Sequence, residues 1–245
     1  MAPSIQTSTI EFSSGELTIP AYLAHPDEKM ECPIIVVLQE VFGVNAHIRN
    51  VTERLAHAGY TAIAPHIYHR QAPNFEVGYS EADLAMGRQY KNGTNVDELL
   101  SDILGAITYV QTYFPNSADQ VGCIGFCFGG HVAYLAATLT VIQATASFYG
   151  AGIGSFTPGG GEPTLNRTPD ISGTLYAFFG LQDPLITQAE IEKIETALQT
   201  HQIDHRIFRY TDATHGFFCD RRDSYHPQAA EDAWQQTLQL FEYSL

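Results

Sequence analysis

One cysteine lies between glycines in a segment that is typical of a reactive turn. The hexapeptide GFCFGG at 125–130 follows an apolar run at 120–124 and precedes a helical pattern. G-x-C-x-G between a strand and a helix has the form of a nucleophile elbow in which cysteine replaces serine. A helix N-terminus behind Cys127 would stabilise a thiolate and a developing oxyanion. The alternative is a small buried residue in a glycine-rich bend, because free cysteines are among the most buried residues.

Two further residues occupy the places that a nucleophile elbow requires. The acid of such a site follows a later strand, and the histidine comes after the acid. In this chain Asp183 follows the apolar run at 174–179, and His215 follows the run at 205–210. An aspartate in a turn or a histidine in a loop is ordinary by itself. Their order favours a triad in which Cys127 attacks a carbonyl carbon, His215 carries protons and Asp183 orients the imidazole.

The elements that must position these residues follow from the hydrophobic pattern. Short apolar runs predict strands, and apolar residues that recur at three and four predict helices. The predicted strands are 34–38, 60–64, 120–124, 144–148, 174–179 and 205–210, after an antiparallel edge hairpin of 7–12 and 16–25. The predicted helices are 47–58, 96–113, 129–138, 187–200 and 227–243. This alternation indicates an α/β fold with a mostly parallel, doubly wound sheet, which binds ligands beyond the carboxyl ends of its strands.

The organisation of the chain indicates a single unit. The sequence has no long linker and no internal repeat, so we expect one domain over residues 1–245. Residues 65–95 are expected to form a partly helical excursion, and residues 152–163 an irregular loop. His131 and Trp234 are expected to pack in the interior rather than to take part in chemistry.

Composition and charge restrict the partners. The 245 residues include 12 Lys and Arg against 27 Asp and Glu, which gives a formal net charge of −15. Nucleic acids and anionic membranes select basic surfaces, so we expect neither as a partner. The beginning MAPSIQTSTIEF has no basic or apolar region of a signal peptide, and no stretch is long enough to span a membrane. We therefore expect a cytoplasmic protein and, by default, a monomer.

The four cysteines predict no metal site. Cys123 and Cys127 are four residues apart, but no second Cys or His pair follows at the spacing of a zinc site. An even number of cysteines in a chain of this length, without a secretion signal, says little about disulfides. Free thiols are the expectation.

Four segments carry a resemblance to a known family. They are QEVFGVN at 39–45, PHIYHRQAP at 65–73, GFCFGG at 125–130, and the pair GLQDP and THGF around Asp183 and His215. With these segments the chain resembles the dienelactone hydrolase (carboxymethylenebutenolidase) family of the α/β-hydrolase superfamily. The resemblance implies an α/β-hydrolase fold and hydrolysis of a carboxylic ester, an enol-lactone in the name-giving members, through an acyl-enzyme on the cysteine. It implies neither a metal nor an organic cofactor.

The resemblance also assigns roles around the nucleophile. By position, the backbone N–H groups of Val41 and Phe128 would form the oxyanion hole. Glu40 matches a glutamate of the family that takes part in thiol activation. A carboxylate near Cys127 disfavours the thiolate by like-charge repulsion, which would keep the resting thiol neutral and protect it from oxidation. We expect Glu40 to turn toward the thiol when substrate binds; the alternative is an ion pair at a loop entrance.

The cations that would bind a substrate carboxylate are less sharply defined. The resemblance implies two arginines, one in the excursion before the elbow and one just after the catalytic histidine. Cys219 stands where the second arginine is expected, and Arg221 and Arg222 follow it. Arg88 is the nearest match in the excursion, and Arg70 is another candidate. The alternative for Arg221 and Arg222 is a solvated surface pair.

Two other functions stay open. A broad-specificity carboxylesterase or thioesterase would use the same triad on neutral substrates. A non-catalytic thiol sensor or binding module would keep a reactive cysteine in a hydrolase fold. The second is disfavoured by Asp183 and His215, because sensing needs a thiol but not an oriented base.

Overall fold

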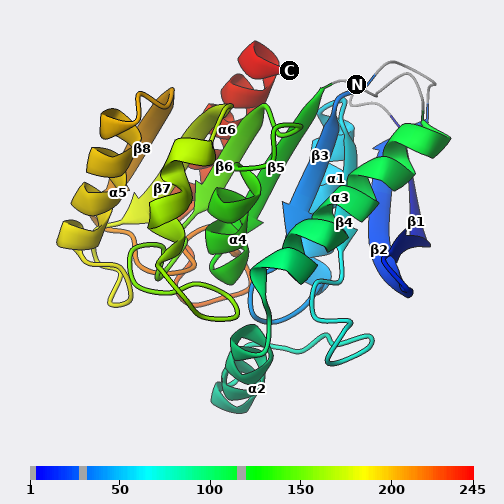
Figure 1. Cartoon of the computed structure of the whole chain (residues 1–245), viewed down its shortest axis with the longest axis horizontal. Helices are drawn as coiled ribbons and strands as arrows, with labels where there is room; N and C mark the ends of the chain where they lie inside the picture. Colours follow the sequence, from blue (N-terminus) through cyan, green and yellow to red (C-terminus); the bar gives the residue numbers. More distant parts are fainter. Residues whose placement is uncertain (1–3, 28–31, 115–119) are drawn as a thin grey trace.

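One eight-stranded sheet crosses the computed structural model, which describes residues 4–27, 32–114 and 120–245. The strands lie in the order β1-β2-β4-β3-β5-β6-β7-β8 (Figure 1). They are β1 (Ile5–Ser14), β2 (Leu17–Pro26), β3 (Ile34–Leu38), β4 (Thr61–Pro65), β5 (Val121–Phe126), β6 (Ala144–Phe148), β7 (Thr174–Gly180) and β8 (His205–Tyr210). β2 pairs antiparallel with β1 and with β4. All other neighbouring strands of the sheet, in the order β4-β3-β5-β6-β7-β8, pair in parallel.

Helices cover both faces of the sheet. They are α1 (Ala46–His57), α2 (Glu81–Asn92), α3 (Val96–Tyr113), α4 (Phe128–Ala136), α5 (Gln188–Thr200), α6 (Pro227–Ser244) and the 3₁₀ helix η2 (Thr164–Asp170). Ile34 and Val36 of β3 pack with α3 and α4, whereas Ile35 and Val37 pack with α1 and α6. Figure 1 shows α3 and α4 in front of the sheet and α6 behind it. β3 is therefore buried on both faces, as its continuous apolar sequence predicts.

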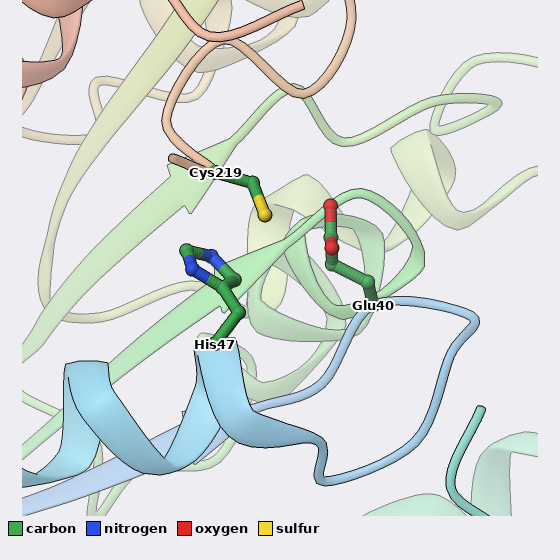
Figure 2. Close-up of side chains that lie close together, drawn as sticks. All are labelled: Glu40, His47 and Cys219. Atoms are coloured by element: carbon green, nitrogen blue, oxygen red, sulfur yellow. The ribbon is translucent and has the colours of Figure 1, made fainter. Parts of the chain in front are cut away.

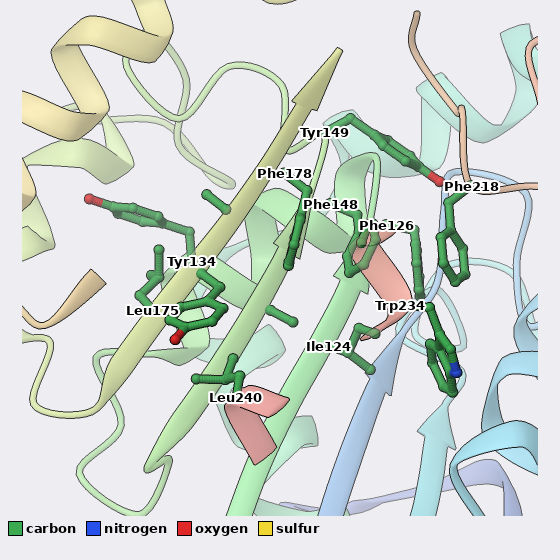
Figure 3. Packing of buried hydrophobic residues seen from close by; sticks show 14 of the residues in the cluster. Ile124, Phe126, Tyr134, Phe148, Tyr149, Leu175, Phe178, Phe218, Trp234 and Leu240 are labelled. Atoms are coloured by element: carbon green, nitrogen blue, oxygen red, sulfur yellow. The ribbon is translucent and has the colours of Figure 1, made fainter. Parts of the chain in front are cut away.

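Aromatic side chains fill the core at the carboxyl ends of the central strands. The rings of Phe126 and Phe218 stack with their centroids 5.2 Å apart, and Trp234 of α6 lies 6.1 Å from Phe218 (Figure 3). Phe148 of β6 and Phe178 of β7 stack at 4.4 Å. This cluster gives the neighbouring strand ends a rigid support, and the polar residues of the candidate site follow directly from those ends.

The predicted doubly wound architecture, the edge hairpin and the partly helical excursion are confirmed, with one addition. Residues 164–170 form η2, for which the sequence offered no apolar period, and Pro169 lies inside it. The excursion at 65–95 contains α2, whose start is a capping box in which Ser80 and Asp83 bond to each other's backbone N–H. Among the helices of the described residues, none combines the length and apolarity that crossing a bilayer requires.

Candidate active site

Cys127 occupies the turn between β5 and α4. Its φ of 56° and ψ of −117° form a conformation that residues with a side chain rarely adopt. Its N–H donates to the Phe148 carbonyl at 3.0 Å. A Cβ on Gly125 would collide with the Gly129 carbonyl, and a Cβ on Gly129 would collide with the Leu38 carbonyl. The flanking glycines therefore let strand and helix approach closely and hold the thiol in a partly exposed position.

Asp183 and His215 meet at the edge of the sheet where β7 and β8 end. His215 Nδ1 lies 2.7 Å from Asp183 Oδ2. The other aspartate oxygen, Oδ1, accepts a hydrogen bond from the Leu185 backbone N–H at 2.8 Å. Because both oxygens are engaged and the side chain is fully buried, the carboxylate has a fixed orientation. It holds the imidazole with Nδ1 as the donor, which leaves Nε2 for proton transfer.

Electrostatics connect His215 with Cys127. Burial lowers the pKa of His215, but the charge of Cys127 and the hydrogen bond with Asp183 outweigh burial and raise that pKa to about 10. Nε2 is itself buried and meets no atom of the described residues in hydrogen-bond geometry. The sulfur and the imidazole are therefore neighbours without a well-formed bond. Such catalytic bonds are commonly loose in ligand-free sites and tighten when substrate binds.

The two backbone N–H groups that the sequence assigns to an oxyanion hole lie near the elbow. Phe128 is the first residue of α4, so its N–H has no partner within the helix. Val41 lies in the turn after β3, and its N–H donates to no backbone carbonyl of the described residues. The close approach of Gly129 to the carbonyls of Leu38 and Gln39 brings this turn against the start of α4. Both N–H groups that the sequence singles out thus belong to segments in contact.

Glu40 is completely buried in the loop after β3. Its Oε1 accepts a hydrogen bond from Arg222 Nη1 at 3.3 Å, and its Oε2 has no partner among the described residues. Burial raises the pKa of Glu40, and the charges of Arg222 and His215 oppose that rise. Arg222, through its charge and its hydrogen bond, contributes most to keeping Glu40 charged inside the protein, and His215 adds to this effect. The ion pair that stood as the alternative for Glu40 is present, and it does not prevent a role in activation.

The candidate arginines occupy different environments. The Arg222 guanidinium carbon lies 5.5 Å from the Phe42 ring centroid and 5.7 Å from that of Tyr79, and its side chain is 21% exposed. Arg221 is exposed and lines a surface hollow instead. Arg70 forms a 2.6 Å ion pair with a buried aspartate of α3. Of the three, Arg222 is the one that combines partial burial with charge contact to Cys127.

Sequence reasoning missed Lys91, the inward-facing cation of α2. Its Nζ lies 4.5 Å from the Phe156 ring centroid and 5.9 Å from that of Phe128. Burial lowers the pKa of Lys91, and the charge of Cys127 opposes this shift. Arg88, the residue singled out in the excursion, is exposed one turn earlier. Residues 88 and 91 are three apart and lie on neighbouring parts of one face of α2, so helical spacing alone could not show which of the two cations points inward.

Tyr149 is a second residue that was not singled out. It directly follows β6, has a φ of 37°, and places its ring 5.1 Å from the His215 ring. Its buried hydroxyl has no partner among the described residues. A polar residue directly after a buried strand was the available signal. His131, in contrast, packs as expected: Nδ1 lies 3.0 Å from the Ala151 carbonyl and Nε2 lies 2.8 Å from Thr164 Oγ1.

Known proteins share this fold and much of the sequence. The family model "Dienelactone hydrolase family" matches residues 19–245. A protein of Synechocystis sp. that is provisionally named carboxymethylenebutenolidase is 51% identical over 245 residues, which are 100% of this chain and 100% of that protein. A protein of Bradyrhizobium sp., provisionally named 2-oxo-3-(5-oxofuran-2-ylidene)propanoate lactonase, is 31% identical and the match covers 92% of this chain and 89% of that protein.

A solved structure agrees with these sequence matches. The crystal structure of a provisionally assigned dienelactone hydrolase from Klebsiella pneumoniae has a TM-score of 0.89 and 29% identity, and the match covers 98% of this chain and 99% of that chain. The predicted α/β-hydrolase fold is thereby confirmed. The chain belongs to the dienelactone hydrolase family.

Proposed function

We propose that this chain opens a small enol-lactone or ester by forming an acyl-enzyme on Cys127. Membership of the family makes the chain a hydrolase of carboxylic ester bonds. The observation that carries the finer proposal is the 2.7 Å contact between His215 Nδ1 and Asp183 Oδ2, at the sheet edge where a strained turn presents the only partly exposed thiol of the described cysteines. The proposal takes residues 1–245 as one monomeric domain.

The reaction proceeds in two halves. The Cys127 thiolate attacks the carbonyl carbon, a C–S bond forms, and the N–H groups of Val41 and Phe128 stabilise the oxyanion. The ester C–O bond then breaks, and the leaving oxygen takes a proton from His215. A water molecule next gives a proton to His215 and attacks the thioester, which releases the carboxylic acid and the thiolate. In a lactone the leaving oxygen stays on the product, so the ring opens without loss of a fragment.

The pair of Glu40 and Arg222 connects activation of the thiol with the charge of the substrate. A substrate carboxylate competes with Glu40 for the Arg222 guanidinium, because guanidinium binds carboxylates strongly. Glu40 released from Arg222 takes the Cys127 proton, so substrate binding favours the thiolate, and Glu40 returns this proton to the sulfur when the product leaves and the pair with Arg222 forms again. The Bradyrhizobium relative is named for a lactone that bears a propanoate group, which supports an anionic substrate.

A neutral ester is the second candidate substrate. Arg222 is already paired with Glu40, so a neutral ester would leave that 3.3 Å contact undisturbed. The two inward cations, Arg222 and Lys91, favour the anionic substrate because nothing in a neutral ester would use them.

Steady-state kinetics with an anionic dienelactone and with p-nitrophenyl acetate separate the two candidates. We expect kcat/KM to be much higher for the dienelactone, and we expect Cys127→Ala to abolish cleavage of both substrates. Cleavage of the neutral ester alone would contradict the proposed substrate class. Undiminished cleavage by Cys127→Ala would contradict the proposed nucleophile.

A further inference from the structure

A cluster of three potential metal ligands lies beside the candidate site, and two of its members have no part in the proposed reaction. Within the described residues, ligand atoms of Glu40, His47 and Cys219 lie within 4.8 Å of one another, and all three residues are buried. Figure 2 shows them converging from the loop after β3, the first turn of α1 and the loop after β8. We propose that these side chains form a binding site for a divalent transition metal ion, zinc in the first place.

Unpartnered buried atoms support this assignment. Glu40 Oε2 and His47 Nε2 are both buried and make no hydrogen bond with any described residue. Buried polar atoms are nearly always hydrogen-bonded or bound to an ion, because leaving them without a partner is costly. The cluster therefore contains a carboxylate oxygen and an imidazole nitrogen that are available to an ion at the same place.

The chemistry of the three donors selects the kind of ion. Thiolate, imidazole and carboxylate together suit zinc and its neighbours in the first transition row, whereas magnesium and calcium prefer oxygen ligands alone. Zinc bonds of about 2.0–2.3 Å separate tetrahedral ligand atoms by roughly 3.5 Å. The three ligand atoms lie up to 4.8 Å from one another, so they must move closer by roughly 1 Å to bind zinc, and small rotations of the side chains supply this movement. Three protein ligands leave the fourth position to water.

Neighbouring groups are placed to support a bound ion. Arg222 holds the opposite oxygen of Glu40, Oε1, at 3.3 Å, so the carboxylate keeps its orientation while Oε2 coordinates. The Cys219 thiol now donates to the Tyr79 hydroxyl at 3.3 Å. When the ion binds, the thiol proton leaves to solvent as the S–metal bond forms, and the Tyr79 hydroxyl can turn its own proton toward the thiolate. Binding of one ion therefore releases one proton, that of the Cys219 thiol.

A cavity beside His47 offers a route for entry of the ion. His47 lines a cavity of about 60 Å³ together with Arg54, Phe218, Asp220, Tyr225 and Glu231. Asp220 and Glu231 are acidic, and the net charge of −15 attracts cations to the protein as a whole. The positive charges of Arg54, Arg221 and Arg222 act on His47 in the opposite sense, so the three ligands themselves must supply the affinity for the ion. The spacing of Cys123 and Cys127, which predicted no metal site, could not indicate this cluster, because its members come from three separate segments.

A bound ion is expected to affect hydrolysis, and this expectation, unlike metal binding itself, rests on the proposed function. An ion bound to Glu40 would hold the carboxylate away from Cys127, so zinc is expected to slow turnover. Binding itself is tested without reference to activity.

Zinc and cobalt titration of a Cys127→Ala variant is the test, since this background removes the catalytic thiol as a competing ligand. Zinc is measured by competition with a chromophoric chelator, and cobalt by its thiolate charge-transfer absorption. We expect one ion per chain and a cobalt band. Cys219→Ala, and separately His47→Ala, added to this background should weaken zinc at least about 100-fold, because even loss of an outer partner costs 10–100-fold.

The matched control is Cys123→Ala in the same background, which removes a buried cysteine of β5 outside the cluster and should leave zinc affinity unchanged. Cys219→Ser provides a conservative replacement in case Cys219→Ala does not fold. The proposal is overturned if Cys127→Ala binds no zinc, or if the Cys219 and His47 variants bind it as the background does. Because the background has no nucleophile, neither result depends on the proposed hydrolytic mechanism.

Discussion

At the scale of single residues, Arg222 makes two kinds of contact that bear on the proposed mechanism. It is the hydrogen-bond partner of the buried Glu40, and it is the partly exposed cation nearest to the aromatic side chains of Phe42 and Tyr79. In the proposed mechanism an anionic substrate binds the Arg222 guanidinium and displaces Glu40, and Glu40 then activates the thiol. The neighbouring Arg221 is exposed and provides a comparison at almost the same position in the chain.

Replacing Arg222 should change substrate choice. In Arg222→Gln we expect kcat/KM for an anionic dienelactone to fall about 10–100-fold, the equivalent of a lost hydrogen bond to a charged group. Cleavage of p-nitrophenyl acetate should change far less, because that substrate brings no carboxylate. Arg221→Gln should remain close to the parent for both substrates. An equal loss for both substrates in Arg222→Gln would mean that Arg222 acts on the fold rather than on the substrate.

The residues at this scale were not equally predictable. Cys127, Asp183 and His215 could be found because their order along the chain and their positions after apolar runs are properties of the sequence. The contact between Glu40 and Arg222 joins residues 182 positions apart, and only the folded chain shows which of the two adjacent arginines turns inward. Their assigned roles stay predictions until variants are measured.

At the scale of elements, the elbow depends on how closely β5, α4 and the turn after β3 approach one another. Gly129 lies in the first turn of α4, and a Cβ there would collide with the carbonyls of Leu38 and Gln39. These are backbone atoms, which cannot rotate away as a side chain can. The same contact brings Val41 and Phe128, the proposed oxyanion-hole residues, into neighbouring segments.

Gly129→Ala should therefore destabilise the fold by about 1–3 kcal/mol through overpacking and should also lower kcat. The free energy of unfolding in urea and the hydrolysis rate at 25 °C measure the two effects. Gly154→Ala is the matched control, because its added Cβ would meet side-chain atoms only at 3.8 Å and 3.9 Å. If both variants unfold at the same urea concentration as the parent, the close approach at the elbow is not a constraint.

The sequence predicted the strands and helices well because each has a clear apolar period or a continuous apolar run. β3, β6, β8 and α3 have the predicted bounds, and the other predicted elements differ by a few residues at their ends. The 3₁₀ helix η2 was missed because TLNRTPD has too few apolar residues to show a period. Its Thr164 nevertheless fixes the His131 ring, which is information that only tertiary contacts provide.

At the scale of the whole molecule, burial of ionisable groups makes stability depend on pH. His131 is completely buried, and burial lowers its pKa to about 4, against a weaker opposing effect of the Ala151 carbonyl. In the unfolded chain a histidine binds its proton near pH 6.5. Between about pH 6.5 and pH 4 the unfolded state therefore binds more protons, and stability must fall as the pH falls.

Removing His131 should flatten this pH dependence. Over the range from about pH 6 to pH 4, the free energy of unfolding of the parent should fall more steeply than that of His131→Gln, by about 1.4 kcal/mol per pH unit. Urea denaturation at a series of pH values gives both curves, and comparing slopes removes the shared contribution of the carboxylates. Parallel curves would show that His131 does not remain neutral in the folded state.

The central claim is that Cys127 is the nucleophile, and alkylation tests it most directly. Cys32, Cys123 and Cys219 are buried, whereas Cys127 is partly exposed, so iodoacetamide should modify Cys127 first. Peptide mass spectrometry gives the modified fraction of each cysteine, and hydrolysis of the anionic dienelactone is assayed in the same samples. We predict that the remaining activity equals the unmodified fraction of Cys127 at every time point. Activity that survives complete modification of Cys127 would contradict the account.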